Sequence, residues 1–319
     1  MVARQLPLFP SDTEHALTRH SRLADAHGPF LAYLRREGRS EHTLKAFASD
    51  LRLVEEYFGE DFVLKDFTTT RLNRFLEWLE HGRGVPCSRK SYARRVTTLK
   101  VFFKFLRSER VLPHDPAEAL LQRSGSAPLQ SVLTEEEVAR LLAYTASLRL
   151  AENPDPRPDL LARLLLDTGV KKSECMRLRP EDVLRADPER PILIVRHPRP
   201  GNVYRERKIP LDPDWLPVLD DYLARYRPQD TIFNCTARNL EYVLHDVALA
   251  AGITSRVSFE ILRWTSAVRD YCRGLDPEEL REKMGLSRIS WRETSQKIAL
   301  LADVYRGAAL SASAPDATE

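Results

Sequence analysis

The sequence contains few cysteines, and they stand far apart. Its 319 residues include four, and no two of them form a C-x-x-C pair. Zinc sites and disulfide frameworks both need cysteines at characteristic spacings, so neither is indicated. We expect the four thiols to be reduced and structural, and we predict no metal and no other cofactor. The four are Cys87, Cys175, Cys235 and Cys272.

Long apolar runs are also missing. No stretch of about 18 uncharged apolar residues is present that could span a bilayer, and residues 1–10 are too weakly apolar for a signal peptide. Nucleotide-binding patterns such as G-x-x-x-x-G-K-S/T and the dinucleotide fingerprint are absent as well. With 43% hydrophobic and 30% charged residues, the chain is typical of a globular protein of two ordinary domains. We predict a cytoplasmic protein with no membrane partner, nucleoid-associated if it binds DNA.

Charge of one sign is not in large excess, but it is unevenly distributed. The formal net charge is only +3, which by itself does not indicate a nucleic-acid partner. Between residues 83 and 110, however, Glu109 is the single acid. Such a run is usually a solvated helix face, yet one almost free of acids favours contact with DNA phosphates. Its basic residues are Arg83, Arg89, Lys90, Arg94, Arg95, Lys100, Lys104, Arg107 and Arg110.

Apolar residues recur at helical spacing in the first third of the chain. One series begins with Leu44, after the good N-cap residue Ser40, and ends before Gly59. The same pattern predicts further helices over residues 30–36, 68–79 and 88–106. We therefore predict an all-helical domain over residues 23–120, preceded by a flexible N-terminus over 1–22.

A stretch with serine, glycine and proline interrupts this pattern. Residues 121–132 include Ser-Gly-Ser-Ala-Pro and are predicted to be an interdomain linker. Directly after it, Thr134 and Glu137 have the spacing of a capping box, which starts a new helix. The second domain is predicted over residues 133–308, with a flexible tail over 309–319.

The second domain also has two short β-prone runs. Residues 192–195 and 208–211 flank a Pro-Gly-Asn sequence, which predicts a hairpin. Helical patterns follow over residues 214–226, 237–251 and 276–284. The predicted fold class is therefore mostly α with a small β-sheet (α+β), an all-helical N-terminal domain followed by a mixed C-terminal domain.

Five segments match, in order, the motifs of one known family. Residues 40–51 are similar to S-x-x-T-L-x-x-Y-x-x-D-L, with Phe47 in place of the tyrosine. Four further matches are residues 167–175 with T-G-L-R-x-S-E, 201–211 with G-K-G-x-K-x-R-x-x-P-L, 257–265 with H-x-L-R-H-T, and 284–295 with L-G-H-S-x-I-x-T-T-x-x-Y. These are motifs of tyrosine recombinases of the Xer and phage-integrase type, which the chain resembles over nearly its whole length.

This resemblance implies a SAM-like core-binding domain followed by a catalytic-type domain, which in the family cleaves DNA with a tyrosine nucleophile. Only Arg263 matches a catalytic position of the family. The substituted positions are Lys171 for arginine, Asn202 for lysine, Glu260 and Leu286 for the two histidines, and Ser295 for the tyrosine. No histidine follows His245 to activate Ser295, and lysine lacks the two-pronged fork of arginine. We therefore predict a DNA-binding protein that lacks strand cleavage and acts as an architectural or accessory factor.

Matches outside the catalytic positions imply contact with double-stranded DNA. They lie in the segment around residue 43, in the basic run and in the predicted hairpin. The implied DNA-binding residues are Thr43, Lys45, Arg89, Lys90, Arg94, Arg95, Lys100, Lys104, Arg199, Arg205 and Arg207.

Two other functions stay open from the sequence. One is a divergent active recombinase that uses Tyr305 or Ser295 as its nucleophile, and the other is a protein-interaction scaffold. Arg263 itself either binds a phosphate or pairs with a local acid such as Glu260.

The spacing around Tyr305 is more typical of the apolar face of a terminal helix. In the family such a helix packs onto a neighbouring subunit, which implies a homo-oligomer or an assembly with an active recombinase. The predicted apolar face consists of Ile298, Leu300, Leu301, Val304 and Tyr305.

Overall fold

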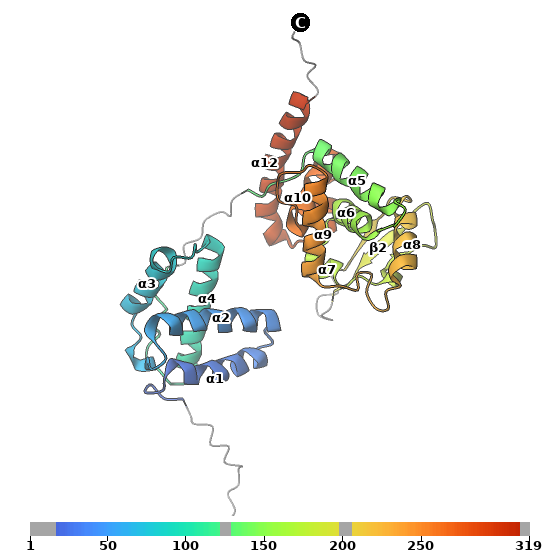
Figure 1. Ribbon diagram of the computed structural model, residues 1–319. Coiled ribbons are helices and arrows are strands. Elements are labelled where there is room, and N and C mark those ends of the chain that lie inside the picture. The colour runs from blue at the N-terminus through green and yellow to red at the C-terminus, as the bar shows by residue number, and fades with distance from the viewer. Residues whose placement is uncertain (1–16, 122–128, 198–205, 313–319) are drawn as a thin grey trace, which may run out of the picture. The chain divides into compact units, whose positions relative to one another are not determined.

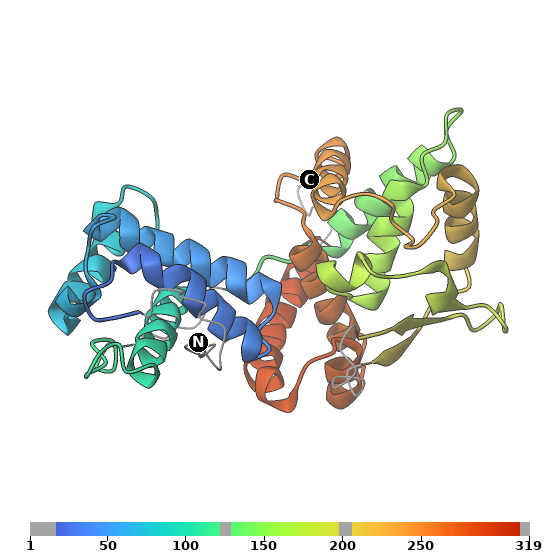
Figure 2. The same cartoon turned by 90° about the horizontal axis from the view of Figure 1, so that it is seen from below.

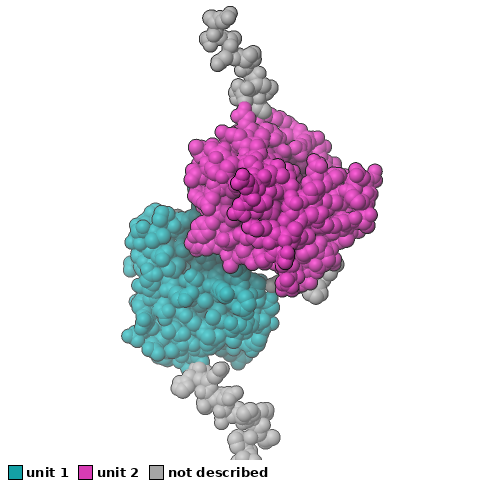
Figure 3. Space-filling model, turned by 45° about the vertical axis from the view of Figure 1, so that its right-hand side comes forward, with its two compact units in different colours: residues 1–128 teal, residues 129–319 magenta. Residues whose placement is uncertain are grey.

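The computed structural model describes residues 17–121, 129–197 and 206–312 of the chain. Its contacts divide the chain into two compact units, residues 1–128 and 129–319, which are coloured separately in Figure 3. We refer to them as the N-terminal and C-terminal units. The boundary between them falls inside residues 121–132, the stretch predicted to be a linker. Among the described residues, no helix combines the length and apolar character that crossing a membrane requires.

The N-terminal unit is a helical bundle, as predicted (Figures 1 and 2). Ser40, Thr68 and Ser88 each cap a helix, because the side chain accepts a hydrogen bond from the main-chain N–H three residues further on. Such a cap satisfies one of the N–H groups that the start of a helix leaves unpaired. The elements are α1 (Leu23–Arg36), α2 (Glu41–Phe58), η1 (Leu64–Asp66), α3 (Thr69–Glu77), the π-helical turn η2 (Trp78–Gly82) and α4 (Arg89–Ser108).

The first helix is longer than predicted. It begins at Leu23 and runs through Pro29, before the predicted start at residue 30. Leu23, Ala26, Phe30 and Leu34 are all buried and follow one another at helical spacing. Their burial outweighs the hydrogen bond that the proline removes.

The C-terminal unit is mixed, with helices around a small antiparallel sheet. The predicted capping box is present, because the Thr134 side chain accepts from Glu137 N and the Glu137 carboxylate accepts from Thr134 N. The helical elements are α5 (Glu135–Arg149), α6 (Arg157–Thr168), α7 (Lys172–Cys175), η3 (Pro180–Asp182), α8 (Trp215–Tyr226), α9 (Ala237–Ala250), α10 (Phe259–Cys272), α11 (Pro277–Lys283) and α12 (Arg288–Ala312). The fold class predicted from the sequence is confirmed.

The sheet has three strands in the order β1-β2-β3, namely β1 (Val183–Leu184), β2 (Ile192–Val195) and β3 (Arg207–Pro210). The pairing of β2 with β3 is the predicted hairpin, with Leu193 opposite Ile209 and Val195 opposite Arg207. Leu193, Val195 and Ile209 are buried in the core of the unit. This alternation of buried and outer residues fixes the register and sets Arg207 at the start of β3.

The terminal helix α12 packs against α10 of its own unit, and Figure 1 shows the two side by side. Ile298, Leu301 and Tyr305 are buried against residues of α10 and α11. Leu300 and Val304, predicted to share this face, are 54% and 68% exposed. Positions 298, 301 and 305 form one stripe at a spacing of three and four residues, and positions 300 and 304 fall beside it.

Candidate functional site

Three cations from different elements converge on the C-terminal end of α11. Lys171 precedes α7, Arg207 begins β3 and Arg263 lies within α10. Three consecutive residues there each accept a hydrogen bond from one of these cations through the main-chain carbonyl. The carbonyls at the end of a helix lack intrahelical partners and carry negative partial charge, so they attract cations. The pairs are Arg207 Nε to Lys283 O at 2.7 Å, Arg263 Nη2 to Met284 O at 2.5 Å and Lys171 Nζ to Gly285 O at 3.3 Å. We call these three side chains the cation cluster.

Arg263 is the most deeply placed member of the cation cluster. It is 8% exposed, and its second terminal nitrogen, Nη1, donates to the carbonyl oxygen of Gly169. Burial lowers the pKa of Arg263 to about 10; the charge of Glu174 opposes this shift and that of Arg207 adds to it. Gly169 ends α6 with a φ of +58°, a left-handed conformation that favours glycine. Arg263 therefore joins the end of α6 to the end of α11.

Arg207 forms a two-pronged ion pair with Glu174. Its Nη1 lies 3.1 Å from Glu174 Oε1 and its Nη2 lies 2.8 Å from Oε2. The side chains are 8% and 10% exposed, so this is a buried pair with the geometry that arginine and carboxylate favour. Burial alone would raise the pKa of Glu174, but the hydrogen bonds and charge of Arg207, with smaller contributions from Lys171, lower it overall.

Gly285 allows the end of α11 to approach the cation cluster. Its φ is +59°, and a Cβ placed there would lie 2.8 Å from Arg207 Nη1. A side chain at this position would therefore displace the buried guanidinium as well as strain the backbone. The glycine of the family-like box serves close packing here, directly beside the cation cluster.

Replacing Glu174 with glutamine is expected to destabilise the protein by about 3 kcal/mol at pH 7, because Arg207 loses its buried counter-charge. Since the pKa of Glu174 is lowered in the folded state, its stabilising effect is complete above the ordinary glutamate pKa of about 4.3 and is lost as the pH falls through the folded value. The difference between wild type and Glu174→Gln should therefore shrink between pH 5 and pH 3, measured by urea unfolding.

The control for this change is Glu241→Gln. Glu241 pairs with Lys172 at 2.8 Å, but both side chains are more than 40% exposed, and exposed pairs contribute little. We expect only a small change in stability from this control at either pH. An equal loss for Glu174→Gln at pH 7 and pH 3 would contradict the ion-pair explanation.

Of the remaining substituted positions, the three that the structure describes form no hydrogen bond or ion pair with the cation cluster. Glu260 is exposed in the first turn of α10, and its charge opposes the lowering of the Arg263 pKa. Leu286 is half-buried against the apolar cluster that includes Tyr305. The Ser295 hydroxyl donates to the carbonyl of Arg292 at 3.3 Å, within its own helix. Asn202 lies outside the described residues, as do Arg199 and Arg205.

Tyr305 lies in an apolar cluster. The residue is 7% exposed and packs with Ala267, Val268 and Leu280. Burial, followed by the proximity of the Glu135 carboxylate, raises the pKa of the Tyr305 hydroxyl. A tyrosine nucleophile is activated by a lowered pKa, and the shift here is in the opposite direction, so this environment suits a core residue.

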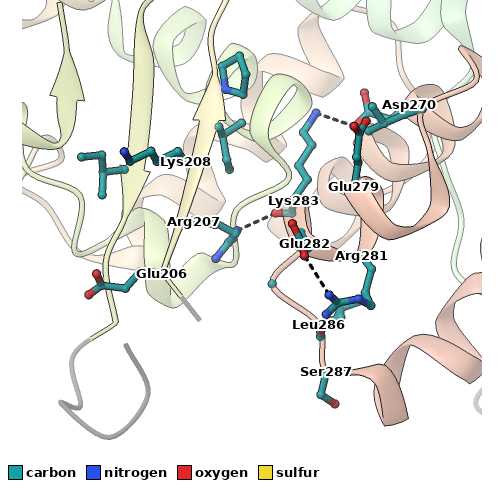
Figure 4. A pocket seen from close by; sticks show the side chains of 15 residues that line it. Glu206, Arg207, Lys208, Asp270, Glu279, Arg281, Glu282, Lys283, Leu286 and Ser287 are labelled. Carbon is teal, nitrogen blue, oxygen red and sulfur yellow. Dashed lines mark hydrogen bonds and ion pairs between the residues drawn. The ribbon is translucent and has the colours of Figure 1, made fainter. Parts of the chain in front are cut away.

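A cleft of about 980 Å³ opens beside the cation cluster, between β3 and α11 (Figure 4). Its charged lining residues are largely paired, with Lys283 at 2.6 Å from Asp270 and Arg281 at 2.7 Å from Glu278. Figure 4 shows Arg207 pointing from β3 to the main chain of Lys283 at one side of this cleft. The cleft therefore has both signs of charge on its walls, unlike a dedicated phosphate site. Among the described residues, no group of three or more His, Cys, Asp or Glu is placed to hold a metal ion.

In the N-terminal unit, two arginines of the basic run face a buried carboxylate. Asp50 of α2 is 2% exposed and lies 2.9 Å from Arg94 and 3.7 Å from Arg95, while Thr98 donates to it at 2.8 Å. Burial raises the pKa of Asp50, and the Thr98 hydrogen bond and the two arginine charges oppose that shift. Arg95, 13% exposed, also donates to Cys87. Part of the positive run is therefore neutralised inside the unit.

Other basic residues of this unit face solvent. Lys90 and Lys104 on α4 and Lys45 on α2 are exposed, and α2 packs beside α4. None of these three lysines forms an ion pair within the described part of the chain. The other predicted DNA-binding positions are Arg89, which is exposed, and Lys100 and Thr43, which are half-buried. We call the exposed cations of these two helices, Lys45, Arg89, Lys90 and Lys104, the positive surface of α2 and α4.

Two important residues were not predicted as site residues. Glu174 and Asp50 both lie within the family-like motifs, at their acidic positions. The acidic position of each motif was the available signal for these two residues. A carboxylate that is buried needs a hydrogen-bond or ionic partner. What the sequence does not give is which arginine that partner is.

Two known domains match this chain. The N-terminal SAM-like domain of phage integrases matches residues 29–110, and the phage integrase family matches residues 131–294. Tyrosine recombinase XerD of Listeria innocua is 26% identical over 295 residues, covering 85% of this chain and 93% of its own. Tyrosine recombinase XerD of Bradyrhizobium diazoefficiens is 28% identical over 291 residues, covering 82% and 88%.

Solved structures with this fold include complexes with DNA. The XerH site-specific recombinase bound to its palindromic difH substrate, a post-cleavage complex, has a TM-score of 0.69 and 17% identity, covering 91% of this chain and 84% of its own. A lambda integrase dimer bound to a COC′ core site has a TM-score of 0.66 and 18% identity, covering 94% and 81%. At these identities the likeness is one of fold.

Proposed function

Because this chain belongs to the phage integrase family, we propose that it binds duplex DNA and does not cleave it. Its relatives are named tyrosine recombinases, and two proteins of similar fold are described as bound to DNA. The positive surface on α2 and α4 supports DNA binding, since exposed cations gain affinity by releasing counterions from phosphates.

The main support for a loss of cleavage is that the hydrogen-bond donors of the cation cluster are already used within the protein. Phosphoryl transfer needs donors aimed at the non-bridging oxygens and a nucleophile in line with the leaving group. Here the donors of Arg207 and Arg263 are directed to Glu174 and to main-chain carbonyls. Five of the six family catalytic positions also differ, and Ser295 has no histidine after His245 to activate it.

The role we propose is that of an architectural or accessory factor that assembles on DNA in the cytoplasm, at the nucleoid. Leu300 and Val304, exposed on α12, are available to a second copy of the chain or to an active recombinase. Such an assembly is consistent with the lambda integrase dimer of similar fold. Apolar side chains that remain exposed on a helix already packed on its other face are suited to a subunit contact.

DNA binding is tested by selecting bound duplexes from a random library at about 0.15 M salt and sequencing them. Enrichment of a motif, above all of two inverted half-sites, would support a sequence-reading binder. Retention without enrichment would support non-specific architectural binding. No retention, even at low salt, would overturn the proposal and favour a protein-interaction scaffold.

Cleavage is tested on nicked duplexes carrying the enriched motif, or on the retained pool. We expect no covalent protein–DNA adduct on a denaturing gel, because removal of a nucleophile and its activating groups leaves rates near background. An authentic XerD treated in parallel controls for the substrate. An adduct that disappears in Tyr305→Phe or Ser295→Ala would instead establish a divergent active recombinase.

A further inference from the structure

A buried carboxylate lies directly beneath the positive surface of α2 and α4. Asp50 accepts hydrogen bonds through Oδ2 from the Thr98 hydroxyl at 2.8 Å and makes an ion pair there with Arg94 Nη1 at 2.9 Å. Asp50 is 2% exposed, whereas the Arg94 side chain is 39% exposed. The pair therefore runs from the core of the unit to its surface.

Arg94 is held at one end only. Its Nη1 also donates to the carbonyl oxygen of Ala46 at 3.1 Å, so both hydrogens of that nitrogen are directed to α2. Its Nε and Nη2 form no hydrogen bond within the described residues, and together they make one edge of the planar guanidinium. This edge has the geometry that binds a phosphate through two parallel hydrogen bonds.

The surroundings of that edge are positive. Lys45 is exposed and directly precedes Ala46, whose carbonyl Arg94 contacts. Lys90 is exposed one helical turn before Arg94 on α4. A phosphate bound by the Arg94 edge would therefore meet further cations from both helices.

We propose that Asp50 is a positioning residue that fixes Arg94 for contact with a DNA phosphate, an inference that rests on the DNA binding proposed above. A free arginine loses rotamer freedom when it binds, and that entropy is costly. Asp50 and the Ala46 carbonyl impose this order before DNA arrives. Asp50 thus assists the binding of DNA, although its own negative charge is repelled by the DNA phosphates.

Two explanations of Asp50 predict opposite signs for Asp50→Asn. If charge alone mattered, removal of a negative charge near the positive surface would tighten DNA binding. If Asp50 positions Arg94, the variant should bind duplex DNA about tenfold more weakly, the equivalent of one charge-assisted hydrogen bond. The negative slope of log affinity against log salt should also become shallower by up to about 0.9, which corresponds to the loss of one phosphate contact.

The experiment compares wild type, Asp50→Asn, Arg94→Lys and the double variant, by fluorescence anisotropy on one duplex over a range of salt. Arg94→Lys keeps the charge but loses the fork, and we expect it to bind about tenfold more weakly. The double variant should be no weaker than Arg94→Lys, because Asp50 acts through Arg94. Glu56→Gln, the same chemical change at an exposed position of α2, should bind as wild type or slightly more tightly.

The outcomes separate this inference from the proposed function. Wild type that is not retained on duplex DNA overturns both. Wild type that binds, with Asp50→Asn equal or tighter, overturns the positioning role alone. If Asp50→Asn does not fold, as its melting curve would reveal, Arg94→Lys decides the question, and unchanged affinity in that variant overturns the inference.

Discussion

Replacing Arg263 with methionine is expected to lower the thermal midpoint of the protein by about 10 °C, since a loss of about 3 to 5 kcal/mol shifts a domain of this size by roughly 2 to 4 °C per kcal/mol. Methionine fills part of the volume but donates no hydrogen bond. The carbonyl oxygens of Gly169 and Met284 would then be left buried without their arginine donor. Calorimetry measures the midpoint, and anisotropy at low temperature measures the duplex affinity, which we expect to stay close to that of wild type.

The control is Arg273→Met, the same chemical change at the exposed C-cap of α10. It is expected to change stability by less than about 0.5 kcal/mol. An Arg263→Met protein that melts like wild type but binds duplex DNA far more weakly would contradict our explanation. In that case Arg263 would serve a bound phosphate, as its family position suggests, and the contacts to α11 would be secondary.

Local chemistry made most of the fold predictable. Ser40 and the Thr134–Glu137 capping box mark helix starts by the hydroxyl and carboxylate groups that the first N–H groups need, and the structure confirms both. The hairpin of β2 and β3 follows from two short β-prone runs around a turn sequence. These signals act over a few residues, so they are visible without knowledge of tertiary contacts.

The structure differs from the predicted fold where tertiary packing determines the extent of a helix or its buried face. The helix predicted over residues 30–36 begins at Leu23 in the structure, and it continues through Pro29 because Leu23 and Ala26 are buried, which is a tertiary effect. On α12, an apolar residue alone does not reveal which face meets α10. Leu300 and Val304 are as apolar as Leu301, yet only Leu301 is buried.

The site shows a deeper limit of prediction from sequence. Family motifs identify Arg263 and Lys171 by position, but both donate hydrogen bonds to main-chain carbonyls. Every residue has such a carbonyl, so no sequence pattern reveals that it has become a partner. Arg207 is predicted to contact DNA from the hairpin, and no sequence pattern reveals the buried pair that its guanidinium forms with Glu174.

The distribution of charge separates the two units. Residues 1–128 hold 21 Lys and Arg against 16 Asp and Glu, whereas residues 129–319 hold 28 against 30. Attraction to a polyanion therefore resides mainly in the N-terminal unit, and the unit with the catalytic-type fold is slightly acidic. A protein that cut DNA would need positive charge at the reacting phosphate, whereas the three side chains of the cation cluster bind main-chain carbonyls and Glu174 of the protein itself.

Replacing Lys45, Lys90 and Lys104 together with methionine is accordingly expected to weaken duplex binding by roughly 100- to 500-fold at 0.1 M salt, because each lost phosphate contact removes a factor of about 8. The three lysines are exposed on α2 and α4. The negative slope of log affinity against log salt should become shallower by about 2 to 3. Titration of a labelled duplex by anisotropy at several salt concentrations measures both quantities.

The control for the triple lysine variant is a second triple change with the same loss of charge, in which Arg36, Lys65 and Arg74 become methionine. These residues are also exposed, but α1, η1 and α3 carry them. Net charge alone would weaken binding equally in both variants, whereas a localised interface loses affinity mainly in the first. Because all six residues are exposed, substitution leaves the core intact, so a difference between the variants reports where the phosphates bind. Equal losses would contradict the interface on α2 and α4.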